Sequence, residues 1–371
     1  MLKTCFQHGS HPVECRNGER EIAHFGFSAI HTPTVSEALV TDRIASETEL
    51  IQTYLAPLAA GYPGAFGLQD DGALIADEPG TDLVVTTDPI ISGVHFFAAD
   101  RASDIAWKAL AVNVSDLAAK GATPLAYTMA LALPEAPEHA WMANFADGLL
   151  SAQTAFGCHL IGGDTDRTPG PLSISITAFG RVPAGGMVRR GTAAVGDHVF
   201  VTGTLGDAAL GLAVHRDGAV FGQHVSSGDR SFLVGRYLRP SPRLEMVAIL
   251  RAFASAALDV SDGLLKDLAR LAGPANASLN VLAARLPVSP PVRKVLEANA
   301  HAQTAVVSGG DDYEILFSVS PNRVAAFLEA VRMVSVQVSE IGVLEPGQGV
   351  AVVDRAGRVI AAGSGGYDHF R

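Results

Sequence analysis

Strand-like and helix-like segments alternate from about residue 46 to the C-terminus, and this alternation limits the folds open to the chain. The helix-like segments place apolar residues on one face, and residues 172–179 alternate apolar and polar residues with the period of a strand. Predicted helices are residues 46–58, 102–120, 138–156 and 207–215. Predicted strands are residues 83–87, 123–133, 159–161, 172–179 and 198–201. Alternation of this kind predicts α/β or α+β layers rather than an all-β or all-helical fold.

The chain divides into three predicted parts. Residues 1–45 lack periodicity and form either an extension without fixed structure or an additional folded element. The Gly-rich stretch at 182–191 (VPAGGMVRRG) interrupts the alternation, as a linker between domains does. With 371 residues, the chain is long enough for two cores. We therefore predict domains at residues 46–185 and 186–371, with a polar loop at 222–230 in the second.

Composition narrows the class of protein. The formal net charge of −11 disfavours a nucleic-acid partner, because proteins that bind its phosphate backbone usually carry a basic excess. No apolar run approaches about 18 residues, so no membrane span is expected, and the N-terminus lacks the apolar core of a secretory signal. The three cysteines form no CxxC pair, which favours a cytoplasmic protein without zinc or disulfides.

Aspartates recur at six places, and we predict that each lies at the end of a strand or in a Gly turn. They are Asp70–Asp71, Asp88, Asp116, Asp164 with Asp166, Asp259 with Asp262, and Asp311–Asp312. A single Asp of this kind is usually a turn or cap residue. The echo between AVNVSDLAAKG (111–121) and LDVSDGLLKDL (258–268) has the same ordinary explanation, two helix caps.

If these six Asp-bearing segments come together in the folded chain, their carboxylates would form one acidic cluster with a role in chemistry. Ionised carboxylates crowd together only with partners, and no Lys or Arg is interleaved at these turns. Oxygen ligands without His or Cys select Mg²⁺, which commonly bridges carboxylates to phosphates. This is the electrostatic arrangement of phosphoryl transfer. No GxxxxGK[ST] motif is present and no GxGxxG follows a strand, so if the chain uses ATP, it does so by another architecture.

Several blocks, in order, resemble a known family. They are QDDGALI, TTDPIISGVHF, WKALAVNVSDLAAKGATP, IGGDTDRTPGPLSISITAFGRVP, ALDVSDGLLKDLARLA, SGGDDYEIL and GGYDHF. The chain is similar over residues 47–370 to the thiamine-monophosphate kinases, in the superfamily of aminoimidazole ribonucleotide synthetase. The resemblance implies a two-domain α/β fold, a homodimer with paired N-terminal sheets, and an N-terminal domain that binds ATP and magnesium. It also implies a cytoplasmic transferase of thiamine biosynthesis.

The resemblance also implies roles for residues. Its implied Mg²⁺ ligands are Asp71, Thr86, Thr87, Asp88, Asp116, Asp164, Asp259 and Asp262. Its implied ATP contacts are Gly163, Asp164, Arg190 and Ser261. Its implied contacts to thiamine monophosphate are His95, Asp311 and Tyr367. No general base is assigned, because the attacking phosphate oxygen is already an anion.

Two alternatives stay open at this point. The first is another ATP-using enzyme of the same superfamily, although Cys158 and the C-terminal sequence YDHFR are poor matches to the relatives that use a reactive cysteine. The second is a catalytically silent nucleotide- or thiamine-binding protein, against which the retained aspartates argue.

Overall fold

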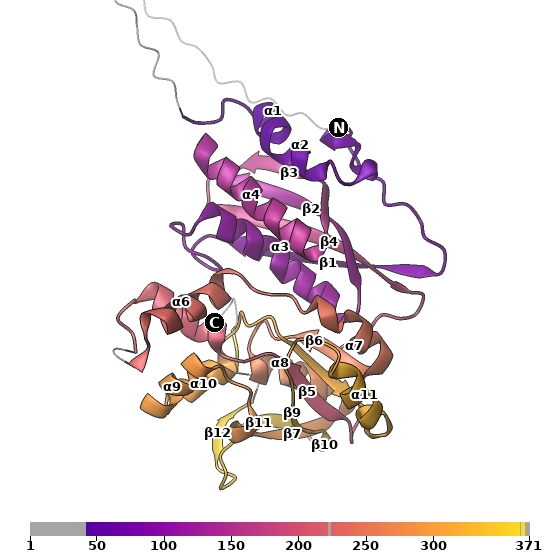
Figure 1. The fold of residues 1–371 in the computed structure, drawn as a ribbon, viewed down its shortest axis with the longest axis vertical. Helices are drawn as coiled ribbons and strands as arrows, with labels where there is room; N and C mark the ends of the chain where they lie inside the picture. The colour runs from indigo at the N-terminus through magenta and orange to yellow at the C-terminus, as the bar shows by residue number, and fades with distance from the viewer. Residues whose placement is uncertain (1–41, 222–223, 364, 368–371) are drawn as a thin grey trace, which may run out of the picture. The chain divides into compact units, whose positions relative to one another are not determined.

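The computed structural model describes residues 42–221, 224–363 and 365–367 (Figure 1). Most of the predicted extension, residues 1–41, therefore lies outside the described residues. Within the described part, no helix is long and apolar enough to cross a membrane.

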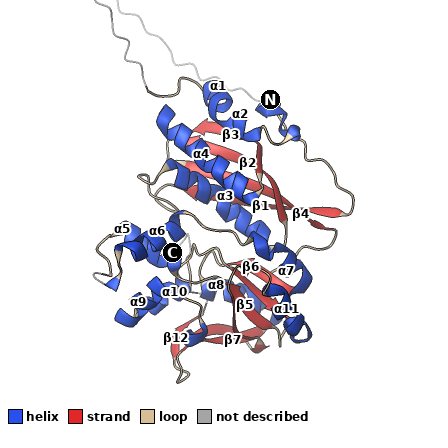
Figure 2. Ribbon diagram, viewed as in Figure 1, coloured by secondary structure: helices blue, strands red, loops and turns tan. Residues whose placement is uncertain are grey.

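The N-terminal half is a four-stranded sheet with helices α3 and α4 packed on one face (Figures 1 and 2). Strand order is β1-β4-β2-β3, and only the β2–β3 pair is parallel. A π-helical turn, Ile51–Leu55, separates α1 from α2. The elements are α1 (Glu47–Leu50), α2 (Ala56–Ala59), β1 (Thr81–Ile91), α3 (Ala102–Ala119), β2 (Thr123–Leu133), α4 (His139–Phe156), β3 (His159–Arg167) and β4 (Ser173–Pro183).

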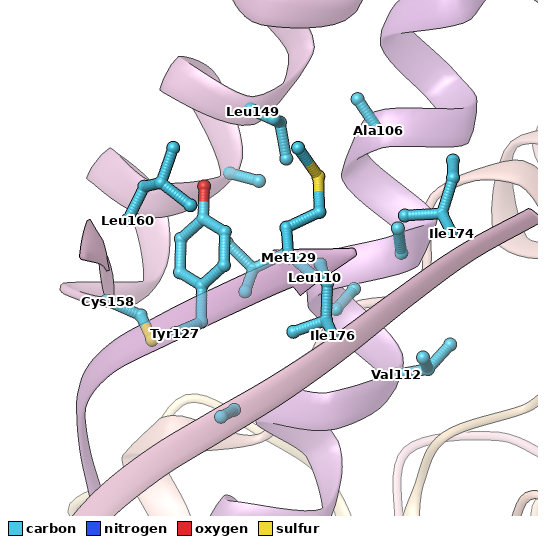
Figure 3. Close-up of a cluster of buried hydrophobic side chains, with 14 of the residues drawn as sticks. Ala106, Leu110, Val112, Tyr127, Met129, Leu149, Cys158, Leu160, Ile174 and Ile176 are labelled. Carbon is cyan, nitrogen blue, oxygen red and sulfur yellow. The ribbon is translucent and has the colours of Figure 1, made fainter. Parts of the chain in front are cut away.

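Apolar alternation fixes which face of this sheet is buried. In β4, Ile174, Ile176 and Ala178 are fully buried, and their neighbours in sequence are only partly buried. The buried set packs with Leu110 of α3 and Leu149 of α4 in one core (Figure 3). The sheet therefore presents its second face without a covering pair of helices.

The C-terminal half contains two further four-stranded sheets, with orders β6-β8-β5-β9 and β10-β7-β11-β12. Its strands are β5 (His198–Thr202), β6 (Ala254–Asp259), β7 (Ala277–Leu282), β8 (Ile315–Val319), β9 (Val338–Val343), β10 (Glu345–Pro346), β11 (Gly349–Val353) and β12 (Val359–Ala362). Its helices are α5 (Asp207–Arg216), α6 (Ser227–Leu238), α7 (Val247–Phe253), α8 (Leu264–Ala272), α9 (Pro290–Ala298), α10 (Ala302–Ser308) and α11 (Val324–Val331). The division into domains at residue 185 stays a proposal.

The structure corrects the predicted loop at 222–230. Helix α6 begins at Ser227, inside that range, and Ser226 and Asp229 form a reciprocal capping box at its start. The Ser-x-x-Asp spacing was the available signal, and it outweighs the polar composition of the segment.

The echo between residues 111–121 and 258–268 does not reflect equal local structure. Asp116 lies inside helix α3, whereas Asp259 ends strand β6 and Asp262 lies in the turn before α8. Asp88 and Asp164 also lie within strands, β1 and β3. The prediction that every Asp ends a strand or occupies a Gly turn is therefore wrong for these three, Asp88, Asp116 and Asp164.

Candidate active site

A cleft of about 1610 Å³ is lined from both halves of the chain. The N-terminal half contributes strand β1 and helix α3, and the C-terminal half contributes the ends of β6, α8 and α10. Ten of the predicted site residues line this one cleft, namely Thr86, Asp88, His95, Asp116, Arg190, Asp259, Ser261, Asp262, Asp311 and Tyr367.

Asp88 and Asp116 meet where β1 passes α3. The Thr86 hydroxyl donates to Asp116 Oδ2 at 2.5 Å, and the Asp88 backbone N–H donates to Asn113 Oδ1 at 2.9 Å. Burial raises the pKa of the Asp88 carboxyl to about 7, and the charges of Asp116 and Asp262 add to this effect. The protein alone therefore does not stabilise negative charge at Asp88.

Asp259 approaches the same place from strand β6. Its Oδ2 accepts a hydrogen bond from the Ser115 hydroxyl at 2.7 Å, and the side chain is buried. Burial raises its pKa well above the ordinary value, with a further contribution from Asp116. Aspartates from β1, α3, β6 and the turn after it thus form one electrostatically coupled cluster.

Basic side chains also reach the cleft, which corrects the expectation that none would neutralise the aspartates. Asp262 Oδ2 lies 3.1 Å from Lys266 Nζ and 2.7 Å from Arg270 Nη2. Lys120 Nζ donates to the Ala257 carbonyl at 2.7 Å and lines the cleft. Lys266 and Arg270 are four and eight residues beyond Asp262, so helix α8 presents both toward it.

The three predicted substrate contacts lie along the cleft. His95 Nδ1 accepts from the Ile91 N–H at 3.0 Å, which fixes the ring against the end of β1. Asp311 Oδ2 lies 3.0 Å from Lys108 Nζ. The Tyr367 N–H donates to the Asp262 carbonyl at 3.1 Å, and the residue is 45% exposed.

A second recess, of about 230 Å³, contains the remaining predicted acidic ligands. Asp71, Gly163 and Asp164 line it, at strand β3 on the opposite edge of the sheet from β1. Gly163 has φ +154°, and a Cβ there would lie 1.9 Å from the Met129 carbonyl oxygen, so only glycine fits. The described chain does not bring these three residues into the main cleft.

Thr87 is also separate from the cleft aspartates. It lies between Thr86 and Asp88 on β1, so its side chain projects from the other face of the strand. Its hydroxyl donates to the Ile176 carbonyl at 3.0 Å. Within the described ranges, no three His, Cys, Asp or Glu side chains are grouped closely enough to hold one metal ion unaided. Mg²⁺ commonly completes its shell with waters and substrate phosphates.

Sequence reasoning missed three residues that shape the site, Lys108, Ser115 and Tyr237. Lys108 Nζ and the Tyr237 hydroxyl both donate to the backbone carbonyl of His95, a predicted substrate contact. The Ser115 hydroxyl donates to Asp259. Helical spacing was a usable signal for Lys108, because residues 108, 112 and 116 share one face of a helix. No local pattern marks Tyr237, which is distant in sequence from every residue it contacts.

Comparison with known proteins defines the class to which this fold and cleft belong. The model of the N-terminal domain of AIR synthase related proteins matches residues 69–182, and that of the C-terminal domain matches residues 194–355. A thiamine-monophosphate kinase of Caulobacter vibrioides is 40% identical over 309 residues, covering 82% of this chain and 86% of that protein.

Solved structures of thiamine-monophosphate kinases are also similar to this chain. A thiamine-monophosphate kinase from Stenotrophomonas maltophilia is 44% identical with a TM-score of 0.70, over 77% of this chain and 89% of that one. AaThiL complexed with AMPPCP and TMP is 30% identical with a TM-score of 0.69, over 87% of this chain and 97% of that one. The chain belongs to the thiamine-monophosphate kinase family. The predicted family and two-domain fold are confirmed.

Proposed function

We propose that this chain transfers the terminal phosphoryl group of ATP to the phosphate of thiamine monophosphate, giving thiamine diphosphate and ADP. The observation that carries the proposal is the convergence of acidic, basic and aromatic side chains on one cleft, in a chain of this family. A phosphate oxygen of the acceptor attacks the γ-phosphorus in line, and the bond to the ADP oxygen breaks. The acceptor oxygen is already anionic, so no general base is required.

The chain's own contribution is positioning and charge. Arg190, Lys266 and Arg270 line the cleft and offer N–H donors for phosphate oxygens. Gly309 and Gly310 line the same cleft, and glycine is required at both because a Cβ would lie 2.3 Å from Ala209 Cβ and 2.2 Å from the Ser261 carbonyl oxygen, respectively. Holding two polyanions in attacking geometry is the main demand of phosphoryl transfer.

The carboxylates fit Mg²⁺. Asp88, Asp116, Asp259 and Asp262, with the Thr86 hydroxyl, offer only hard oxygen ligands. Burial and the neighbouring Asp116 and Asp262 raise the pKa of Asp88, so a cation bound beside it would favour its ionised form. Bound Mg²⁺ would supply neutralisation of charge on the transferred group. Thr87, and Asp71 and Asp164 in the second recess, stay predicted ligands, and Gly163, Arg190 and Ser261 stay predicted ATP contacts.

We propose further that the chain forms a homodimer through the β1–β4 side of the sheet face opposite α3 and α4. The β2–β3 end of that face is covered, because Ala126 and Ile161 pack with Ala59 of α2 and with Ala65. Leu83 and Val85 of the edge strand β1 are 44% and 54% exposed, although both are large and apolar. An edge strand with exposed apolar side chains favours pairing with a second strand. The buried free thiol of Cys158 supports a location in the reducing cytoplasm.

The test is to incubate the purified chain with ATP, Mg²⁺ and thiamine monophosphate and to separate the products. Equal amounts of thiamine diphosphate and ADP are expected. Parallel reactions with unphosphorylated thiamine as acceptor should give no phosphorylated product. Binding of thiamine monophosphate and ATP without turnover would instead indicate the silent binding protein and would overturn the proposal.

A further inference from the structure

Lys108 is a buried cation that lies beside His95 and Asp311, two of the residues proposed to contact thiamine monophosphate. Its side chain, on helix α3, is 2% exposed. Nζ donates to Asp311 Oδ2 at 3.0 Å and to the His95 carbonyl at 3.0 Å. Nζ also lies 3.8 Å from the centroid of the Tyr237 ring, a cation–π contact. One ammonium group therefore contacts two of the three proposed thiamine-phosphate residues.

These two contacts join distant parts of the chain. His95 follows strand β1, while Asp311 precedes strand β8. The Tyr237 hydroxyl, from helix α6, donates to the same His95 carbonyl at 3.1 Å. The His95 backbone is thus held by two donors from two different helices, and the position of Asp311 is tied to it through Lys108.

The segment that carries Asp311 has an unusual backbone, which the N–H groups of Asp311 and Tyr313 tie to the carbonyls of Ser261 and Val260 at 2.9 Å each. Asp311 has φ +70° and Tyr313 has φ +50°, in the left-handed region that side chains other than glycine rarely adopt. The intervening Asp312 is anchored separately, because its carboxylate accepts from the N–H groups of Gly206 and Ala208 at 2.6 and 3.1 Å. The Asp311 carboxylate, by contrast, has Lys108 and the Tyr313 hydroxyl (3.3 Å) as its side-chain partners.

We propose that Lys108 is a positioning residue that sets the Asp311 carboxylate and the His95 segment for the acceptor. This inference rests on the proposed function. Lys108 acts through these two groups rather than on the phosphates, because its ammonium is buried and its donors are directed to Asp311 and His95. Its loss should therefore weaken use of thiamine monophosphate far more than use of ATP.

The experiment compares steady-state kinetics of the wild type, Lys108→Met, Lys108→Arg, Asp311→Asn and the double variant Lys108→Met/Asp311→Asn. Lys108→Met is expected to raise KM for thiamine monophosphate at least about tenfold, since the partly buried Asp311 carboxylate loses its charged partner, and to change KM for ATP less than about threefold. Lys108→Arg should recover part of the loss. The double variant should lose less than the product of the two single losses, as coupled residues do.

Arg239→Met is the matched control, because the Arg239–Asp104 ion pair also joins α3 to the C-terminal half but lies outside the cleft. Equal effects of Lys108→Met and Arg239→Met, equal changes in both KM values, or multiplicative losses in the double variant would overturn the inference.

Should Lys108→Met fail to fold, the double variant carries the test, because it removes both charges of the ion pair. If the KM of the double variant for thiamine monophosphate stays within about threefold of that of Asp311→Asn, the inference is supported. A KM about tenfold higher than that of Asp311→Asn contradicts it. If the wild-type chain makes no thiamine diphosphate, the proposed function itself is wrong. If the wild type is active and Lys108→Met has the same kinetics, only the role of Lys108 is wrong.

Discussion

Asp88 shows at the scale of a single residue why the cleft requires a ligand. Its carboxyl is enclosed beside Asp116 and Asp262, so its negative charge is disfavoured by burial first and by like charge second. Lys266 and Arg270 are paired with Asp262. Asp88 and Asp116 therefore lie on the β1 and α3 side of the cleft, while Lys266 and Arg270 lie beside Asp262 on the α8 side, so both signs of charge are available to a metal-bridged phosphate chain.

Asp88 should make the stability of the metal-free protein depend on pH. Its pKa is raised from 3.8 to about 7, so between these values the folded chain holds a proton that the unfolded chain has lost. The proton on Asp88 therefore stabilises the folded chain fully below about pH 4, and this stabilisation is lost as the pH rises through about 7. A pKa difference of one is worth about 1.4 kcal/mol, so wild type should lose on the order of 2 kcal/mol relative to Asp88→Asn between about pH 5 and pH 8.

Urea denaturation with EDTA at the two pH values measures this difference. Asp147→Asn, at an exposed position of α4, is the control and should follow the wild type. Parallel pH dependence of the wild type and Asp88→Asn would contradict the account of Asp88. Saturating Mg²⁺ should flatten the wild-type curve, because a bound cation favours the ionised carboxylate.

Residue types at the cleft were predictable from the sequence, but their partners were not. Recurrent Asp within Gly-rich motifs pointed to a phosphate-handling site, and five of these Asp lie at one cleft, with five further residues that the family resemblance implied. The pairing of Asp262 with Lys266 and Arg270 depends on how α8 leaves the turn at Gly263, where φ is +108°. The contact of Lys108 with Asp311 spans 203 residues, and no local pattern encodes it.

At the scale of elements, two glycines in helices should respond in opposite ways to alanine. Gly148, in α4, faces α3 so closely that a Cβ would lie 2.4 Å from the Ser103 carbonyl oxygen. Gly235, in α6, has nothing within 4 Å of a Cβ. Gly235→Ala should stabilise the protein by about 0.5–1 kcal/mol through helix propensity, whereas Gly148→Ala should destabilise it by about 1–3 kcal/mol through overpacking.

Chemical denaturation of both variants measures the two changes, and each variant is the control for the other. Stabilisation by Gly148→Ala would show that α3 and α4 do not approach as closely as the structure has them.

Element types followed from periodicity where burial is one-sided. The alternation of β4 and the apolar face of α4 are direct consequences of a sheet packed against helices on one face. The start of α6 was missed because its first turn is polar and is recognised by capping rather than by apolar spacing. Asp116 was misplaced at a strand end although it falls inside the helix predicted for residues 102–120, because the Val-Ser-Asp echo with residues 258–268 was given more weight than the helical pattern.

At the scale of the whole molecule, the β1–β4 side of the sheet face opposite α3 and α4 predicts a dimer. Light scattering coupled to size exclusion should give twice the chain mass. Replacing Leu83 and Val85 together by Asp should shift the protein to a monomer, since buried like charges oppose pairing of the sheets. Val359→Asp, at a 62% exposed apolar residue of β12, is the control and should stay dimeric. A wild-type monomer, or a dimer unaffected by the double change, would contradict this interface.

The rate of thiamine diphosphate formation in Asp71→Asn and Asp262→Asn tests the central claim most directly, because these residues lie in the second recess and in the main cleft. Both should keep the melting temperature of the wild type within a few degrees, and both should reduce kcat at saturating ATP, Mg²⁺ and thiamine monophosphate by about 100-fold or more. Near-wild-type kcat in both folded variants would show that phosphoryl transfer does not depend on these carboxylates.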